Sequence, residues 1–566
     1  MMLPTLVYTQ KFDNVWVMGY NWDADPQGET YRLNFDTFPP RLQVYPGDLS
    51  IDYAYAGICD SFGNLQLYTN NCVIADGEGH IIPNGDTMTV GWDLDWCTTY
   101  GWHPYSMHNL FIPIPEDTQR LYLFSKSTYV TNVPTLEVYQ NKLMYSIVEM
   151  GTSPENTKVV TKNRTILQGR LGYGQITAAK HGNGRDWWIP VPEEKSNKIS
   201  MVLISKDTVY VDHTHNMGPI WGDSGSFQAS FSPDGTHYVR YNRFYGVYIY
   251  DFDRCNGTLS NLVHFDFNDT TQGIYGGCAI SPNNEWLYLA DFDSLYQFDL
   301  HASNILTSKL LIGVYDGHIS TLWTKFSHII QGPDGRMYVK PPGSTSSMHV
   351  INRPNLRGIE CDVQQHFIEF PNPYGNPPNH PNYRLGPLDG SPCDTLGIDN
   401  HPLADFRPDP TDSNALALRL WDVSSYEPAE WLWDFGDGSA VSQDTSPVHT
   451  FPAPGFYTVC LTVANQYSAS SKCKVVQVKV SGVTDPAGGM QFAVYPNPTT
   501  GILMVSGLDA TGCLADMFDI SGRKLASLHL TDNTIDLSGL SSGIYFVRLT
   551  QPEGNQIGIF KVIISK

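Results

Sequence analysis

An aromatic cluster near residue 100 holds the side chains best suited to binding chemistry. The segment 91–97, GWDLDWC, alternates rings with carboxylates and shows no clean alternation of apolar and polar positions. Aromatic rings beside carboxylates can stack on sugars while the acids bond hydroxyls. We expect a loop that folds back to cover its own sheet, the alternative being a ligand-binding loop. Its candidate residues are Trp92, Trp96, Tyr100, Trp102 and Tyr105.

Two other motifs carry groups that could do chemistry. In Asp212-His213-Thr214-His215 a strand would place both imidazoles on one face, and one more ligand could complete a metal site. A polar loop explains the same residues, so neither a metal nor a cofactor is assigned. The segment 222–226, GDSGS, resembles the nucleophile loop of trypsin-like proteases. It has no identifiable base or oxyanion hole, so no catalytic residue is assigned.

Composition restricts the class of protein that positions these residues. The chain has 566 residues, which corresponds to roughly three or four domains. It is 41% hydrophobic and 16% charged, with 49 Gly and 38 Pro, and this favours an all-β, loop-rich fold. The net charge of −22 argues against binding to nucleic acids or anionic membranes. No apolar run is long enough for a transmembrane helix, and residues 1–8 do not resemble a signal peptide.

A repeat of about 50 residues organises the first two thirds of the chain. Tight turns such as 232–235, SPDG, precede aromatic strands, and resemble those of TolB-type and WD-repeat propellers. Repeats of this length predict propeller blades, whereas two stacked β-domains would not give equal steps. We therefore expect a seven-bladed β-propeller over residues 1–370, with residues 4–9 supplying a closing strand. The aromatic positions that mark the blades are Trp16, Tyr68, Tyr122, Trp188, Tyr238, Tyr288 and Tyr338.

Acids lie near several of the expected blade turns, at Asp251, Asp253, Asp291 and Asp293. Two carboxylates about 5–9 Å apart could hydrolyse a glycoside, but sequence spacing does not establish such a distance. Turn capping is the expected role of these acids.

Cysteine placement favours an oxidising compartment. Four pairs bracket expected strands or connections, although connectivity does not follow from sequence. The expected pairs are Cys59 with Cys72, Cys255 with Cys278, Cys361 with Cys393, and Cys460 with Cys473.

Beyond the propeller, residues 371–402 hold eight prolines and predict an extended connector that does not pack as an element. The motif in 431–439, WLWDFGDGS, and the strand 455–465 then resemble a PKD repeat, an immunoglobulin-like sandwich, over residues 403–480. Physically, alternating rings form one buried face and Gly-Asp-Gly makes a turn. The motif residues are Trp433, Asp434, Phe435, Gly436, Asp437 and Gly438.

A linker at 481–489 leads to residues 490–566, which are similar to the type A C-terminal sorting domain of the Bacteroidetes type IX secretion system. Its short apolar strands, separated by Asn-Pro and Ser-Gly turns, predict another small antiparallel sandwich. The resemblance implies export through the translocon, removal by a sortase, and release or attachment at the cell surface. Because such cargo needs a leader, we expect that the start of the sequence was placed too late or trimmed. The motif residues are Tyr495, Pro496, Asn497, Pro498, Gly501, Gly522, Gly543 and Tyr545.

Together these features predict a secreted or cell-surface protein whose propeller binds a glycan or protein, with the PKD domain as spacer or adhesive module. One alternative is an extracellular hydrolase or lyase acting on a polysaccharide, with its site in the propeller channel. The other is a structural subunit of a surface assembly. Because propellers host many unrelated functions, the fold alone does not choose between them.

Overall fold

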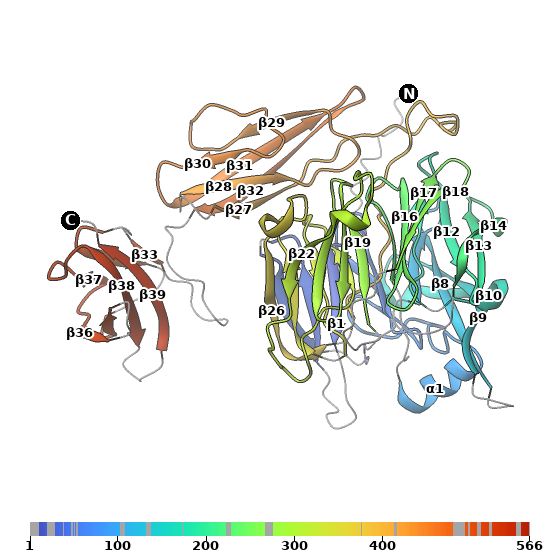
Figure 1. The fold of residues 1–566 in the computed structure, drawn as a ribbon, viewed down its shortest axis with the longest axis horizontal. Coiled ribbons are helices and arrows are strands. Elements are labelled where there is room, and N and C mark those ends of the chain that lie inside the picture. Colours follow the sequence, from blue (N-terminus) through green and yellow to red (C-terminus); the bar gives the residue numbers. More distant parts are fainter. Residues whose placement is uncertain are drawn as a thin grey trace. The chain divides into compact units, whose positions relative to one another are not determined.

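The structure is a computed structural model in which the chain divides into two compact units (Figure 1). Unit 1 comprises Met1–His401 with Ser425–Glu427, and unit 2 comprises Pro402–Ser424 with Pro428–Lys566. The residues that it describes are 11–19, 29–37, 39–46, 49, 51, 55–101, 108–131, 137–172, 174–221, 228–266, 275–343, 345–374, 376–411, 416–478, 493–495, 499–506, 511–519, 523–550 and 556–564.

Unit 1 contains seven consecutive antiparallel sheets, and the strands in each sheet follow one another in chain order. The three-stranded sheets are β1 (Val15–Gly19), β2 (Glu29–Asn34), β3 (Arg41–Pro46); and β4 (Ala56–Cys59), β5 (Leu65–Thr69), β6 (Ile74–Asp76). The third sheet is β7 (Asn109–Pro113), β8 (Arg120–Thr131), β9 (Glu137–Glu149) and β10 (Lys158–Leu171), and the fourth is β11 (Ala179–Lys180), β12 (Trp187–Pro192), β13 (Ser196–Ile204) and β14 (Val209–Trp221). The fifth is β15 (Gln228–Phe231), β16 (His237–Asn242), β17 (Gly246–Asp253) and β18 (Thr258–Phe265), and the sixth is β19 (Gly277–Ile280), β20 (Trp286–Asp291), β21 (Ser294–Asp299) and β22 (Leu310–Val314). The seventh is β23 (Ile329–Gln331), β24 (Met337–Val339), β25 (Thr345–Ile351) and β26 (Val363–Tyr374). The helices are α1 (Trp92–Tyr100) and the short 3-10 helices η1 (Pro154–Asn156), η2 (Leu306–Ser308) and η3 (Gly358–Cys361).

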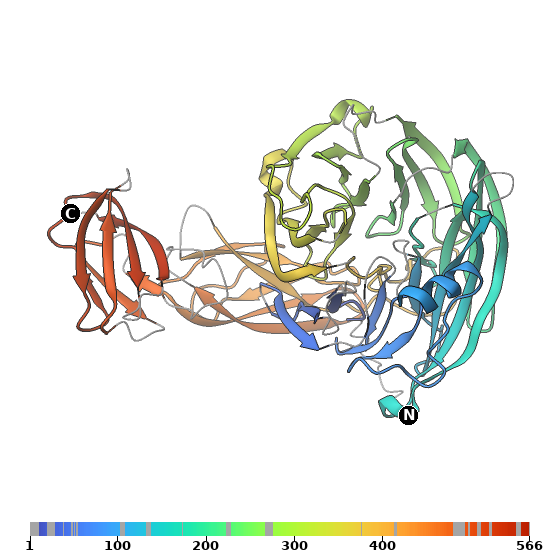
Figure 2. The ribbon, with the colours of Figure 1, turned by 90° about the horizontal axis from the view of Figure 1, so that it is seen from below.

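Figure 2 shows these sheets set around a common axis, so unit 1 is propeller-like. The seven aromatic positions of the repeat all lie in strands and are all buried, one in each sheet. Tyr238, Tyr288 and Tyr338 lie in β16, β20 and β24, the second strands of their sheets, although Tyr238 packs toward the preceding sheet and the other two toward the following one. The 50-residue spacing therefore reflects one large ring per sheet, packed between neighbouring sheets. The residues 4–9 that were expected to close the ring lie outside the described part of the chain.

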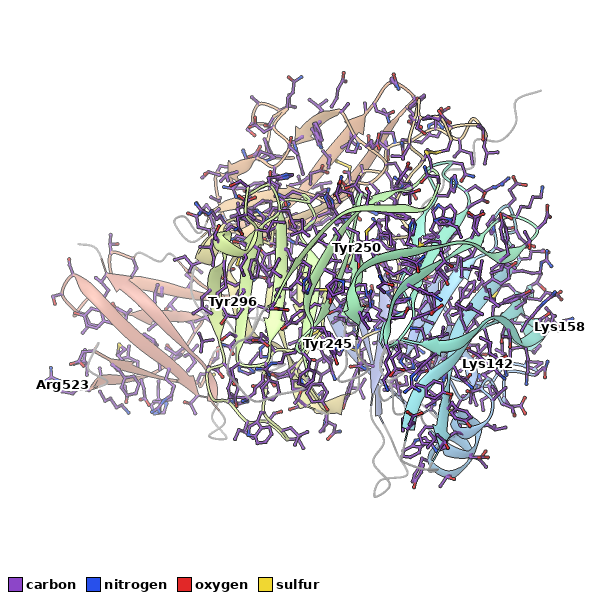
Figure 3. The ribbon with its side chains drawn as sticks, turned by 45° about the vertical axis from the view of Figure 1, so that its right-hand side comes forward. Lys142, Lys158, Tyr245, Tyr250, Tyr296 and Arg523 are labelled. Carbon is purple, nitrogen blue, oxygen red and sulfur yellow. A yellow bond between two sulfur atoms is a disulfide. The ribbon has the colours of Figure 1, made fainter. Side chains whose placement is uncertain are left out.

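Antiparallel pairing gives unit 1 two distinct ends. Turns from a second to a third strand, and connections from a fourth strand to the next sheet, lie at the same end. This end carries α1 and the β16–β17 turn, and we call it the α1 face. In Figure 3, Tyr245 in that turn lies nearer this end than Tyr250 does, five residues along in β17. The turn at 232–235 lies at the other end.

The connector packs against the innermost strands. Residues 371–374 belong to β26, and the chain from 376 to 401 has neither helix nor strand. Asn379 donates from Nδ2 to the carbonyl of Asn109, the first residue of β7, at 2.9 Å. Tyr383 donates from its hydroxyl to the carbonyl of Phe111, two residues further along β7, at 2.7 Å. The N–H of Leu388 donates to the carbonyl of Gly182, just beyond β11, at 2.8 Å. The connector therefore runs beside the first strands, in their direction.

Charge and covalent contacts fix the connector in place. Arg384 makes a two-pronged ion pair with Asp13, at 2.6 and 2.5 Å, and Cys393 forms a disulfide with Cys255. Tyr383 is only 1% exposed. The connector is therefore extended and cross-linked, as expected, but it also packs against unit 1, which was not expected. Polar side chains reach the carbonyl groups that the innermost strands present to the axis, and satisfying those groups favours packing.

Three of the four expected disulfides are wrong. The structure joins Cys72 to Cys97 and Cys255 to Cys393, whereas Cys59, Cys278 and Cys361 are buried free thiols, as is Cys513. The physical reason is that Cys278, Cys361 and Cys513 lie in three different hydrophobic cores, too far apart to pair with one another. Cys460 and Cys473 are joined, as expected, because they lie opposite each other on paired strands.

Unit 2 is also built from antiparallel sheets, with separate cores for its two parts. In the first part, β27 (Phe406–Pro410), β28 (Ala417–Asp422) and β30 (Val448–Thr450) form one sheet, and β29 (Glu430–Asp434), β31 (Gly455–Ala464) and β32 (Ala469–Val478) form the other. In the second part, β33 (Ala493–Tyr495), β34 (Ile502–Ser506) and β37 (Thr534–Asp536) form one sheet, and β36 (Lys524–His529), β35 (Leu514–Phe518), β38 (Gly543–Thr550) and β39 (Gln556–Ile564) form the other.

Candidate functional site

The expected aromatic loop is a helix in the structure. Trp92, Trp96 and Tyr100 lie four residues apart on α1 and therefore on one side of it. The ring centroids of Trp92 and Trp96 are 5.0 Å apart, and those of Trp96 and Tyr100 are 4.4 Å apart. The helix ends at Gly101, whose φ of 75° is left-handed and favours glycine. The spacing of the rings and the flanking glycines was the sequence signal for this helix.

Helix α1 is fixed to the sheets beneath it at three points. A disulfide links its Cys97 to Cys72. The buried carboxylate of Asp93 accepts a hydrogen bond from the N–H of Thr128 in β8 at 2.6 Å. Asn70 donates from Nδ2 to the carbonyl of Gly101 at 2.9 Å. Asp93 thus holds the helix in place. The carboxylate that was expected to bond sugar hydroxyls beside the rings is instead bonded to the protein backbone.

The stacked rings are only partly covered. Trp92 and Trp96 are half-buried, and Tyr100 is 47% exposed. Trp102 and Tyr105, the other two candidates, lie outside the described residues. The stack therefore combines both sequence-based expectations, because it covers part of its sheet and also presents ring surface to solvent.

The rest of the α1 face also exposes large apolar side chains. Phe244 lies in the β16–β17 turn, and Ile319, Leu322 and Trp323 lie in the connection from β22 to β23. Trp323 is 57% exposed and Phe244 is 50% exposed.

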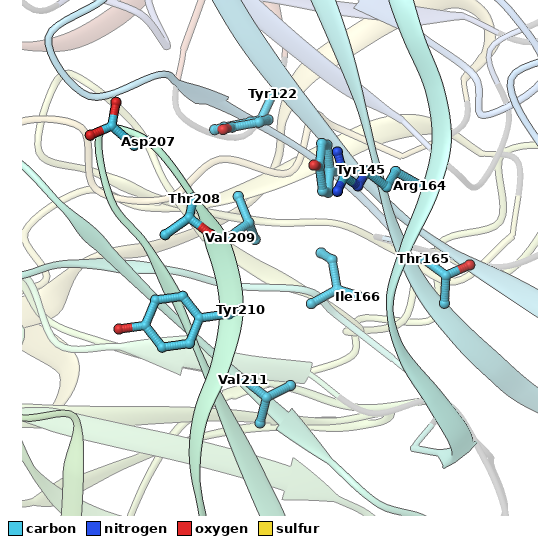
Figure 4. A pocket seen from close by; sticks show the side chains of 10 residues that line it. All are labelled: Tyr122, Tyr145, Arg164, Thr165, Ile166, Asp207, Thr208, Val209, Tyr210 and Val211. Atoms are coloured by element: carbon cyan, nitrogen blue, oxygen red, sulfur yellow. The ribbon is translucent and has the colours of Figure 1, made fainter.

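A shallow hollow of about 330 Å³ lies between the outer strands β10 and β14 (Figure 4). Tyr122 and Tyr145 meet edge to face at 5.2 Å, and the Arg164 guanidinium lies 6.0 Å from the Tyr145 ring centroid. Burial raises the pKa of Tyr122, so this hydroxyl stays protonated at neutral pH. The remaining lining residues are Thr165, Ile166, Asp207, Thr208, Val209, Tyr210 and Val211. Sequence reasoning missed this hollow because strands distant in the chain form it.

The acids near blade turns have structural partners. Asp253 accepts the N–H of Cys255 at 2.7 Å and caps its turn, while Asp291 and Asp293 form ion pairs with Arg243 and Lys325, at 3.0 and 2.5 Å. Asp251 accepts from Asn261 at 2.8 Å. Of these acids, Asp253 caps a turn as expected, whereas Asp251, Asp291 and Asp293 bind side chains of neighbouring segments.

A serine, histidine and aspartate chain that the sequence did not reveal joins the last two sheets of unit 1. Ser347 Oγ is 2.7 Å from His366 Nδ1, and His366 Nε2 is 3.0 Å from Asp316 Oδ2. Ser347 is fully buried, whereas the side chain of Asp316 is 41% exposed. A nucleophile needs the reverse arrangement, with an accessible serine and a sheltered acid. This chain of contacts therefore holds the sheets together.

Two further sequence motifs fall in different settings. Asp212, His213 and His215 lie within β14 and not in a loop. Residues 222–226 lie outside the described part of the chain. In the parts that are described, no three or more His, Cys, Asp or Glu side chains gather as a metal site, and no helix has the length and apolarity to cross a membrane.

The PKD motif forms a core and a capped turn in unit 2. Trp433 and Phe435 are buried, and His449 stacks on Phe435 with ring centroids 3.8 Å apart. Asp437 binds His449 Nε2 at 2.7 Å. Gly436 has a φ of 72°, and a Cβ there would lie 2.2 Å from a backbone oxygen, so only glycine fits. Asp434 accepts the N–H of Gly436 at 2.9 Å, and Gly438 has a φ of 80°.

The sorting-domain motif is described only in part. Tyr495 ends β33, Gly501 precedes β34, and Gly543 begins β38. Tyr545 donates from its hydroxyl to the carbonyl of Ser541 at 3.0 Å, bracing that strand. Pro496, Asn497, Pro498 and Gly522 lie outside the described residues, as does the 481–489 linker.

Comparisons with known proteins assign two of the parts. Residues 400–480 match the PKD domain family, and residues 493–565 match the secretion system C-terminal sorting domain family. The chain thus carries a PKD domain followed by a type IX sorting domain. The sorting domain marks it as a secreted or cell-surface protein that the type IX machinery handles.

Solved structures resemble separate parts and the whole chain. The PKD1 domain of Vibrio anguillarum Epp is 28% identical over 15% of this chain and 99% of its own, with a TM-score of 0.13. A putative 6-phosphogluconolactonase from Bacteroides uniformis is 12% identical over 64% of this chain and 98% of its own, with a TM-score of 0.38. PorZ, a surface component of the type IX secretion system of Porphyromonas gingivalis, is 10% identical over 98% of this chain and 81% of its own, with a TM-score of 0.23.

Proposed function

We propose that this chain is a type IX cargo protein that binds an extracellular glycan or protein at the α1 face of its propeller. In this proposal the seven sheets of unit 1 are seven blades over residues 1–370. The PKD domain, 403–480, is an immunoglobulin-like spacer or adhesive module. The domain at 490–566 is a second sandwich, recognised by the translocon and removed by the sortase.

The stacked rings of α1 carry the binding proposal. Aromatic faces bind the apolar faces of sugars and also anchor protein partners. In α1 these rings are pre-ordered by a disulfide and by Asp93, so little conformational freedom is lost on binding. The exposed Phe244 and Trp323 extend the apolar surface of the same end.

The enzyme alternative has less support. A polysaccharide hydrolase or lyase with its site in the channel needs open space and free acids along the axis. The connector runs beside the innermost strands there, with Asn379 and Tyr383 bonded to their carbonyl groups. The blade-turn acids that we considered are engaged in caps or ion pairs.

Substitution on the two ends of unit 1 tests the binding proposal. We expect Trp96→Ala to weaken binding to an immobilised glycan or surface-protein panel by about 5–30-fold, as for loss of an aromatic anchor. Phe62→Ala is the matched control, because Phe62 is 74% exposed in the β4–β5 turn at the other end. Circular dichroism checks that both variants fold. Equal affinities for wild type and Trp96→Ala would contradict the proposal.

Export is tested separately by mass spectrometry of the protein recovered from the native cell surface. We expect no peptides from beyond about residue 490 if the sorting domain is removed. Recovery of Phe560 and Lys561 in the mature form would argue against removal.

A further inference from the structure

Two histidines of β14 converge on a carbonyl group of the neighbouring sheet. His213 and His215 are alternate residues of the strand, so they point to the same side. Their Nε2 atoms are 3.0 Å apart, and each is 3.2 Å from the carbonyl oxygen of Gly257. Gly257 lies in the turn between β17 and β18, so the three atoms join two adjacent sheets.

The surroundings decide where the imidazole protons lie. His213 Nδ1 is 2.8 Å from Asp212 Oδ2, and a carboxylate can only accept, so the proton of a neutral His213 is on Nδ1. The N–H of Leu259 lies 3.2 Å from His215 Nε2 and needs a lone pair there. In the tautomer with both Nε2 atoms unprotonated, these atoms and the Gly257 oxygen are three acceptors within 3.2 Å of one another. A cation among them would relieve their mutual repulsion.

The triangle of acceptors has the size of a metal coordination face. With ligand distances of about 2.0–2.1 Å, neighbouring donors of a tetrahedral zinc ion are roughly 3.3 Å apart. The observed separations of 3.0, 3.2 and 3.2 Å are close to this. A carboxylate on the far nitrogen of a ligating histidine, as Asp212 provides for His213, is the usual support for such a ligand.

We propose that His213 Nε2, His215 Nε2 and the Gly257 carbonyl oxygen bind a divalent first-row transition metal ion such as Zn²⁺ or Cu²⁺. Imidazole nitrogen is a preferred ligand of both ions. Because the described residues bring no third His, Cys, Asp or Glu side chain to the site, water completes the coordination. The ion links the fourth and fifth sheets of unit 1 and replaces the Leu259 N–H as the partner of His215.

The competing state is a neutral pair in which His215 carries its proton on Nε2 and donates to the Gly257 carbonyl, which satisfies these atoms without a metal. The two states differ in metal uptake, so experiment separates them.

The test is titration of the full-length, chelator-treated protein with ZnCl₂ and, separately, CuCl₂ at pH 7.5, followed by calorimetry. We expect one equivalent to bind at this site, with that event lost in both His213→Gln and His215→Gln. Asp212→Asn should weaken binding about 10-fold through loss of ligand support. His264→Gln is the control, since His264 lies in β18 seven residues beyond Gly257 and bonds the Tyr245 carbonyl at 3.0 Å instead.

A second measurement follows the thermal stability of the protein instead of its affinity for the metal. Saturating zinc should raise the unfolding temperature of wild type and of His264→Gln, and leave His213→Gln unchanged. If wild type takes up no metal at millimolar concentration, or if His213→Gln binds as wild type does, the proposal is overturned.

Discussion

Tyr383 gives the sharpest test of the packed connector. Its side chain is buried, its ring centroid lies 5.4 Å from that of Phe12 and 6.2 Å from that of Trp187, and its hydroxyl donates to the Phe111 carbonyl at 2.7 Å. Tyr383→Phe keeps the ring and removes one buried hydrogen bond, leaving a carbonyl without this donor. We expect a loss of about 1–3 kcal/mol in the free energy of unfolding.

Tyr383→Ala removes the ring as well and leaves a cavity among aromatic neighbours. Its cost should reach about 3–5 kcal/mol, the range for a buried aromatic residue replaced by alanine. Tyr129→Phe is the control, because Tyr129 is 43% exposed on β8 and surface changes of this kind fall within about 0.5 kcal/mol.

Differential scanning calorimetry of the full chain resolves this prediction, because the transition of unit 1 can be followed apart from those of unit 2. We expect the order of stability wild type, Tyr383→Phe, Tyr383→Ala for that transition alone. A connector that merely spans between domains would leave the unit 1 transition of Tyr383→Ala at the wild-type temperature. That result would refute the packing argument.

Three further predictions concern protonation and cross-linking. Burial lowers the pKa of Lys126 to about 7, below the value of about 10.4 in the unfolded chain. The free energy of unfolding should therefore rise between pH 7 and 10, and it should rise less in Lys126→Met. Equal slopes of unfolding free energy against pH in the two proteins would contradict this. Against the opposing effect of burial, hydrogen bonding from Ser439 lowers the pKa of Asp437 to about 2, so the PKD domain should lose stability as pH falls from about 4 to 2. This loss, followed by acid titration of circular dichroism, should be smaller in Asp437→Asn. Replacing Cys72 and Cys97 by serine should leave the sheets intact but speed proteolysis within α1, and unchanged cleavage would show that the bridge does not hold the helix.

The repeat was visible in the sequence because each sheet buries a large ring from one of its strands. Tyr238, Tyr288 and Tyr338 show this clearly, since they share both a spacing of 50 residues and complete burial. The PKD motif could also be recognised from the sequence, because Trp433 must be buried and Gly436 has no room for a side chain. Such local demands on residue type can be recognised without a structure.

Features that depend on distant contacts were not predictable in this way. Cys255 pairs with Cys393, 138 residues away, and only the path of the connector brings them together. Asn379 and Tyr383 lie in a segment rich in proline, which indicates extended chain but not the carbonyl groups that these side chains find. The α1 helix is an intermediate case, because its four-residue ring spacing was present but was not recognised as helical.

The central claim, binding without cleavage at the α1 face, is tested most directly by one incubation. A protein ending near Val480 is mixed with a panel of polysaccharides and proteins, and mass spectrometry measures both retained protein and new fragments. We predict intact substrates, with the protein retained on at least one of them and released when Trp96 is replaced by alanine. New fragments would contradict the account, since they would establish an enzyme and direct attention to the acids and histidines of unit 1.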